Sequence, residues 1–137
     1  MAGYSQAAMV SAYRSVAVHG VAAEADPHRL ISILFDGALE RLSLAKSCIE
    51  VGKKVDKTQA LHRVVQILNE LRASLDHSVG GELSNNLERL YDYMVRRTLH
   101  ANLHSDAQAI DEVGRLLSQI RNAWDAIPVD QRARQAG

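Results

Sequence analysis

Cysteine, proline and aromatic residues are scarce in this 137-residue chain, which has one cysteine, two prolines, one tryptophan, one phenylalanine and four tyrosines. The single Cys48 cannot form an internal disulfide, and a lone cysteine fits a reducing compartment. The length corresponds to one domain that buries a normal hydrophobic core without disulfides or metals. A disulfide-stapled secreted fold is therefore excluded.

An excess of charge of one sign is missing too, because 16 Lys and Arg balance 16 Asp and Glu. No overall field attracts nucleic acid or an anionic membrane. The N-terminus, "MAGYSQAAMVSAYRSVAV", has no basic segment followed by an unbroken apolar stretch, and no apolar run approaches the ~20 residues that span a bilayer. Ala2 in place of glycine excludes myristoylation. We expect a cytoplasmic domain without nucleic-acid partners or direct membrane insertion.

What the chain does have is apolar residues at the i, i+3, i+4 spacing of amphipathic helices, in four stretches, while no stretch alternates with period two. The first helix starts at Pro27 after the cap Asp26 and ends at Gly52. The second runs from about Lys57 to Ser78 and ends at Gly80-Gly81, and the third begins near Glu82. The fourth follows Ser105 as N-cap, with Asp106 in its first turn, and stops at Pro128. Helices of this length with short loops predict an all-α fold, an antiparallel up-down four-helix bundle.

The predicted organisation has three parts. Residues 26–127 form the bundle, and residues 128–137 form a flexible C-terminal tail. Residues 1–25 are small and mildly apolar without a clear amphipathic pattern. They are expected to form an N-terminal arm or a short extra helix, which leaves open whether this segment covers a groove.

Residues that could carry chemistry do not assemble into a known catalytic or metal-binding pattern. His100 and His104 have the i, i+4 spacing of two metal ligands on one helical face, but no Glu-x-x-His pair accompanies them and the helix ends there. We interpret them as surface histidines at a helix C-terminus. Cys48 has no neighbouring histidine, and no nucleophile elbow or phosphate-binding loop occurs. We expect no enzymatic activity, no cofactor and no metal.

The third helix also carries tyrosines next to Arg96 and Arg97, a combination that can stack on RNA bases. Asp92 lies one turn before Arg96, so that the two can form an i, i+4 ion pair. A salt-linked helix face is the better interpretation.

Apolar side chains lie on a second side of the first helix. At about 100° per residue, Ile33 and Leu44 point well away from the row that contains Leu34 and Phe35. Ile67 of the second helix and Tyr93 of the third are also off their main stripes. Two explanations stay open here: a wide buried face, or grooves that accept apolar helices of a partner.

Four segments resemble the flagellin-specific export chaperones of the flagellar type III secretion system, the FliS family. They are "DPHRLISILFDGAL" (26–39), "LDHSVGGELSNNLERLYDYMVRR" (75–97), "ANLHSDAQAIDEV" (101–113) and "LLSQIRNAWDAI" (116–127), with Tyr13 upstream. Departures are small: Asp26 stands where the family more often has Ser or Thr, and Phe35 replaces a common tyrosine.

The resemblance implies a cytoplasmic chaperone that binds the disordered C-terminal region of flagellin and prevents premature polymerisation. It also implies delivery to the export apparatus, where the cytoplasmic part of the membrane export gate recognises the loaded chaperone. The sequence leaves open whether an anti-sigma factor or co-chaperone also binds and whether a homodimer forms.

From the second apolar row and the resemblance, we predict a flagellin-binding surface formed by Tyr4, Tyr13, Leu30, Ile33, Leu44, Ile67 and Tyr93. The rival hypothesis is a regulatory helical adaptor that binds a non-flagellin partner or a copy of itself.

Overall fold

The computed structural model describes residues 5–13 and 27–127, apart from the side chain of Val79, and all regular structure in these residues is helical. The helices are α1 (Gln6–Ala12), α3 (Pro27–Val51), α4 (Lys54–Ala73), α5 (His77–His104) and α6 (Ala107–Asp125). The predicted all-α bundle is confirmed. Asp26, Pro128 and the predicted C-terminal tail lie outside the described residues.

Helix α3 illustrates how the sequence specifies each element. Pro27 is its first residue, where a missing N–H costs nothing. Its buried residues recur at three- and four-residue intervals from His28 to Cys48 and form one apolar stripe. The helix ends at Gly52, whose φ of 76° allows the N–H groups of Gly52 and Lys53 to bond back to the carbonyls of Ile49 and Cys48. The predicted boundaries of this helix are confirmed.

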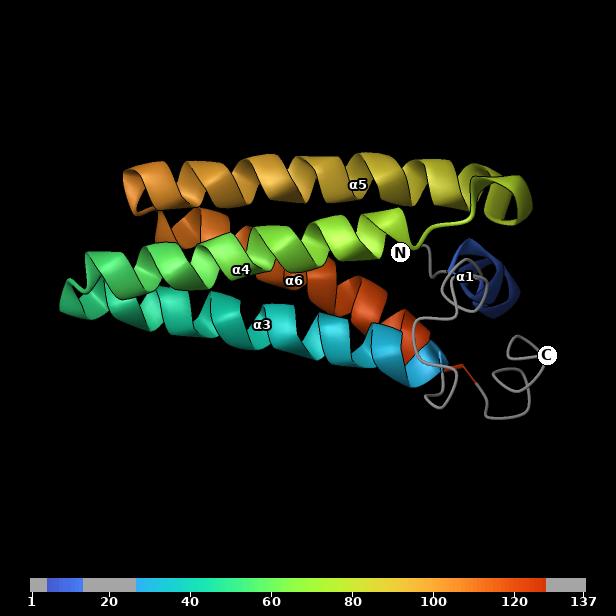
Figure 1. The fold of residues 1–137 in the computed structure, drawn as a ribbon, viewed down its shortest axis with the longest axis horizontal. Helices are drawn as coiled ribbons and strands as arrows, with labels where there is room; N and C mark the ends of the chain where they lie inside the picture. The colour runs from blue at the N-terminus through green and yellow to red at the C-terminus, as the bar shows by residue number, and fades with distance from the viewer. Residues whose placement is uncertain (1–4, 14–26, 128–137) are drawn as a thin grey trace.

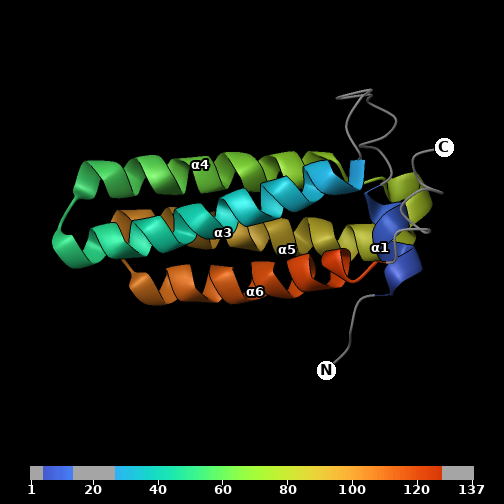
Figure 2. The ribbon, with the colours of Figure 1, turned by 90° about the horizontal axis from the view of Figure 1, so that it is seen from below.

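The four long helices form a closed antiparallel bundle. Helix α3 packs against α4 and α6, and α5 packs against the same two helices, so α3 and α5 lie diagonally opposite (Figure 1). The view from below shows the same arrangement (Figure 2). The core between them contains Phe35, Leu68, Tyr91, Met94 and Leu117, each fully buried or nearly so.

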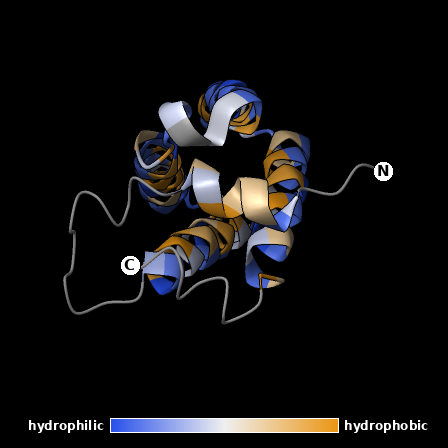
Figure 3. Ribbon diagram, turned by 90° about the vertical axis from the view of Figure 1, so that its right-hand side faces the viewer, coloured by the Kyte–Doolittle hydropathy of each residue, from blue (hydrophilic) through white to orange (hydrophobic). Residues whose placement is uncertain are grey.

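Helix α1 lies across one end of this bundle, against α5 and α6 (Figure 3). Met9 and Ala12 are buried, and the N–H of Asp76 donates to the carbonyl of Ala12 at 2.6 Å. At Gly80, a Cβ would come within 2.8 Å of the Cα of Ala12. The close contact between α1 and the start of α5 therefore requires glycine at position 80.

Three boundaries differ from the sequence predictions, and the first is the start of α4, which lies at Lys54 rather than near Lys57. The second helix, α4, ends at Ala73 and not near Ser78, and α5 begins at His77, before Gly80-Gly81. The glycine pair does not end α4; Gly81, at φ 57° and ψ −129°, bends α5 after its first turn. Continuous helix after the bend starts near Glu82, as predicted for the third helix.

The end of the bundle opposite α1 is closed by polar caps. The N-cap of α6 is Asp106, whose side chain accepts from the N–H groups of Gln108 and Ala109; the prediction of Ser105 as N-cap is wrong. Ser105 instead has a φ of 50° and ends α5. The ammonium of Lys57, which is 6% exposed, donates to the carbonyl of Asn102 and to Oγ of Ser105 at 2.9 and 2.7 Å. One buried cation thus caps the C-terminus of α5.

Candidate functional site

An exposed apolar row runs along the outer side of α3 and consists of Ile33, Leu44 and Val51. Their side chains are 52%, 48% and 67% exposed. At about 100° per residue, the three lie within roughly 20° of one another around the helix axis. Their common direction means that one partner segment along α3 could contact all three.

Helix α4 borders this row. Gly37 lies between Ile33 and Leu44, and a Cβ at position 37 would lie 3.5 Å from Cδ1 of Ile67. Ile67 itself is only 3% exposed, so it forms part of the seam between α3 and α4 and presents little surface of its own. Leu30 is partly buried and packs against the core at the beginning of α3. Of these four predicted residues, Ile33 and Leu44 are therefore exposed, Leu30 is partly buried and Ile67 is buried.

Tyr13 is in a different environment from the exposed residues that we predicted for partner binding. It is 2% exposed, and its ring lies edge-on to Phe35 and Trp124, at centroid distances of 6.2 and 5.0 Å. Its hydroxyl forms a hydrogen bond with that of Tyr91. In the structure Tyr13 therefore holds α1 against the core. Tyr4 lies outside the described residues.

Tyr93 lies at the seam between α5 and α6, away from the row on α3. Its hydroxyl donates to Oε2 of Glu112 at 2.5 Å, and Nε of Arg97 donates to the other carboxylate oxygen at 2.8 Å. The hydrogen bond from Tyr93, together with Arg97, lowers the pKa of Glu112, and the same carboxylate raises the pKa of Tyr93. Arg96 lies over the Tyr93 ring and pairs with Asp92 at 3.1 Å, which confirms the predicted i, i+4 pair.

Three further exposed apolar residues lie near the polar-capped end of the bundle: Val55 on α4 and Leu99 and Leu103 on α5. Sequence reasoning did not select them. The i, i+4 spacing of the two leucines was the available signal, but it also fits a buried stripe. Bonds from Lys57 and Thr58 to Asn102 show that the start of α4 adjoins the end of α5.

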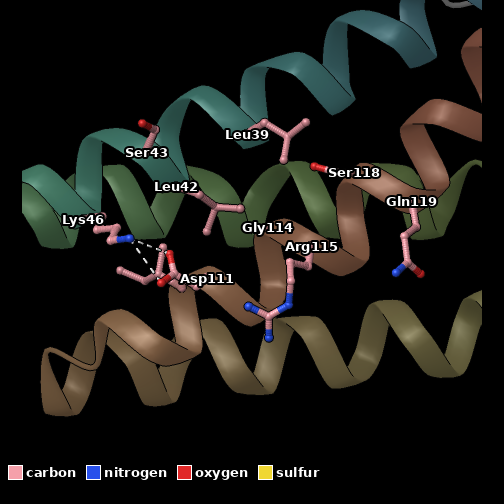
Figure 4. Close-up of a pocket in the computed structure, with 10 residues that line it drawn as sticks. Leu39, Leu42, Ser43, Lys46, Asp111, Gly114, Arg115, Ser118 and Gln119 are labelled. Carbon is pink, nitrogen blue, oxygen red and sulfur yellow. Dashed lines mark hydrogen bonds and ion pairs between the residues drawn. The ribbon is translucent and has the colours of Figure 1, made fainter.

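A groove lies between α3 and α6, on another side of α3 (Figure 4). It measures about 720 Å³, and its apolar wall includes Leu39 and Leu42. Lys46 and Asp111 form an ion pair across it at 2.9 Å, and Ser43, Arg115 and Gln119 add polar groups. The groove is therefore a mixed, partly charged surface.

The histidines near the end of α5 are engaged within the chain. His100 bonds to the N-cap carboxylate of Asp106 at 3.2 Å, and the rings of His100 and His104 lie 4.6 Å apart. Hydrogen bonds from the backbone N–H of Ala109 and from His100 lower the pKa of Asp106. Among residues 5–13 and 27–127, no group of three or more His, Cys, Asp or Glu could hold a metal ion. The helices in these ranges also include none that is long and apolar enough to cross a membrane.

Together, an all-helical bundle and an uncovered apolar row are typical of a small protein that binds other polypeptides. A family model described as flagellar protein FliS matches residues 9–131. The chain is 49% identical over 119 residues to the flagellar secretion chaperone FliS of Salmonella typhimurium, covering 86% of this chain and 88% of that protein.

Two further relatives agree. The flagellar secretion chaperone FliSB of Pseudomonas aeruginosa is 39% identical over 84% of this chain and 91% of its own length, and FliS of Vibrio cholerae is 35% identical over 87% and 88%. The chain belongs to the FliS family of flagellar secretion chaperones. This is a chaperone family and not an enzyme family, and its name implies a flagellar partner.

Proposed function

We propose that this protein is a cytoplasmic export chaperone that binds the disordered C-terminal region of flagellin. By covering the apolar faces of that region it prevents premature polymerisation, and it delivers flagellin to the type III export apparatus. The loaded chaperone is then recognised by the cytoplasmic part of the membrane export gate. The observation that carries this proposal is the row of Ile33, Leu44 and Val51 on α3, whose side chains are about half to two thirds exposed.

The chemistry of the row supports a helical client. Three apolar side chains lie along about 27 Å of helix axis, at 1.5 Å per residue, with Glu40 between Ile33 and Leu44 on nearly the same side, and an amphipathic helix lying along α3 could contact all three. The chain has no net charge that would favour long-range electrostatic capture. Burial of apolar surface is therefore the expected driving force.

A client that folds on binding also suits export. Ordering a disordered segment costs part of the interaction free energy, so a large contact surface gives moderate affinity. Flagellin could then be held securely in the cytoplasm and still be released unfolded.

Isothermal titration calorimetry of the full chain with a flagellin C-terminal peptide tests the proposal. We expect one-to-one binding with a large negative heat-capacity change, because apolar surface is buried as the peptide folds. A flagellin peptide from the central, non-polymerising region is the matched control and should not bind. Absence of binding to the C-terminal peptide would reject the proposal, and a different main partner in a bacterial pull-down would then favour the adaptor hypothesis.

A further inference from the structure

Gly37 lies inside the 25-residue helix α3, well away from both ends. Glycine in a helix interior is less stable than alanine, because it loses more backbone entropy and exposes the backbone to water. A glycine at this position therefore needs a reason. Either the fold of the chain itself requires it or something outside the chain does.

The fold of the chain does not require it. The backbone of Gly37 is helical, since positive φ occurs among the described glycines only at Gly52 and Gly81. A Cβ at position 37 would meet only Cδ1 of Ile67, at 3.5 Å, which is an ordinary van der Waals distance. Gly80 shows the contrast, because a Cβ there would overlap the backbone of α1 at 2.8 Å.

The position that the missing Cβ of Gly37 leaves open, between Ile33, Leu44 and Ile67, is called the seat. Ile33 lies one turn before Gly37, and Leu44 lies two turns after it, about 16 Å from Ile33 along the axis. Ile33 and Leu44 are about half exposed and stand above the helix surface on either side of Gly37, and the exposed side chain of Glu40 lies between Gly37 and Leu44 on nearly the same side of α3. Beside the missing side chain is the buried Ile67, which gives the seat an apolar floor.

We propose that Gly37 is a specificity-determining residue of the α3 row: the gap left by its missing side chain receives one bulky apolar side chain of the client helix. This inference rests on the proposed function. The client is accordingly an amphipathic helix with a large aliphatic or aromatic residue at the position facing Gly37. Even a single methyl group at position 37 would narrow the seat.

Gly37→Ala tests the seat because stability and binding should change in opposite directions. The variant should have a higher Tm, by about 3 °C, since alanine favours the helix and its methyl group fits beside Ile67. It should bind the flagellin C-terminal peptide roughly tenfold more weakly, as overpacking an interface displaces the seated side chain. A residue with a merely structural role would not give this pair of results.

Gly114→Ala is the matched control. Gly114 also lies inside a helix, α6, and a Cβ there would meet nothing within 4 Å, but it faces the groove between α3 and α6. Its variant should gain similar stability and bind as the wild type does. Equal weakening in both variants, unchanged binding by Gly37→Ala, or a lower Tm for Gly37→Ala would each overturn the inference.

Binding by the wild type and binding by Gly37→Ala test two different claims, the proposed function and the role of Gly37. If wild-type protein fails to bind the peptide, the proposed function is wrong. If wild type binds and Gly37→Ala binds equally well, the function stands and only the seat is wrong. A peptide scan adds a positive signature, because truncating the seated side chain to alanine should weaken binding to wild type by more than it weakens binding to Gly37→Ala.

Discussion

The two outward faces of α3 differ in shape and in chemistry. One face carries Ile33, Leu44 and Val51, about half to two thirds exposed and beside a filled seam with α4. The other borders the groove with α6, where Lys46 and Asp111 pair across the opening (Figure 4). The first has exposed apolar side chains, and the second has a groove lined in part by charge.

This difference shows why the presence of a groove is not enough to identify a partner-binding site. Water in a polar groove is easily exchanged, and an ion pair with both side chains over 40% exposed contributes little to stability. Burying exposed leucine and isoleucine side chains against a partner, in contrast, lowers the free energy of the complex. If the proposed function holds, we expect the client on the apolar row rather than in the groove between α3 and α6.

Ser43 and Leu44 offer the strongest test, because these neighbours lie on the two different faces. Leu44→Glu should weaken binding of the flagellin C-terminal peptide by at least about thirtyfold, since it places a charge in the apolar contact. Ser43→Glu adds the same side chain one residue away, beside the groove, and should change the affinity by less than about threefold. Calorimetric titration of both variants measures the contrast.

Circular dichroism and thermal unfolding provide the control for this pair. Both positions are exposed, so both variants should remain helical with Tm values close to that of the wild type. Comparable loss of binding in the two variants would erase the distinction between the faces. Loss of helicity in Leu44→Glu would show that Leu44 supports the core.

Tyr93 extends the comparison to the seam between α5 and α6. Tyr93→Phe removes the hydrogen bond to Glu112 and should lower the free energy of unfolding only slightly, because the hydroxyl lies near the surface. Its effect on peptide affinity should stay within about twofold, because the tyrosine is engaged with Glu112 and lies apart from the α3 row. Urea unfolding and calorimetry measure the two quantities, and a large loss of affinity at unchanged stability would make Tyr93 a client contact.

The sequence predicted the helical fold and the α3 row because both depend on local periodicity. Ile33 and Leu44 are distinguished from the core stripe by their angle on one helix alone, and Gly52 ends α3 through its own backbone conformation. Such features need no knowledge of tertiary contacts. The i, i+4 pair between Asp92 and Arg96 is of the same kind.

The features that the sequence did not predict depend on contacts between distant segments. In the sequence, Gly80 predicts the end of a helix, and only the position of α1 shows that it allows a close contact. Tyr13 is predicted to belong to an arm, and only its hydrogen bond to Tyr91 shows that it belongs to the core. Asp106 and Ser105 are adjacent cap candidates, and their roles follow from how α5 ends. Periodicity carries no information about such pairings.

The smallest expected effect is the loss of folding stability in acid, and the carboxylates that cause it do not lie on α3. Because the folded-state pKa of Glu112 lies below its ordinary value, its contribution to stability is present above an unfolded pKa of about 4.3 and is lost as the pH falls through the folded pKa. The hydrogen bond from Arg72 likewise lowers the pKa of Glu88 on α5, so Glu88 also loses its contribution to stability in acid. Stability should therefore decline from about pH 5 to pH 3.

Glu112→Gln should make this decline shallower, because one carboxylate no longer titrates. The expected difference is roughly 2 °C in Tm between pH 7 and pH 3, since the carboxylate is about one third exposed and its ion pair with Arg97 is weak. Peptide binding through the apolar row should not change between pH 7 and pH 6, because Ile33, Leu44 and Val51 are not ionisable. Parallel Tm curves for variant and wild type would contradict the role of Glu112. A binding change over that neutral range would instead show that titrating groups contact the client, and the apolar face of α3 would then not be sufficient for recognition.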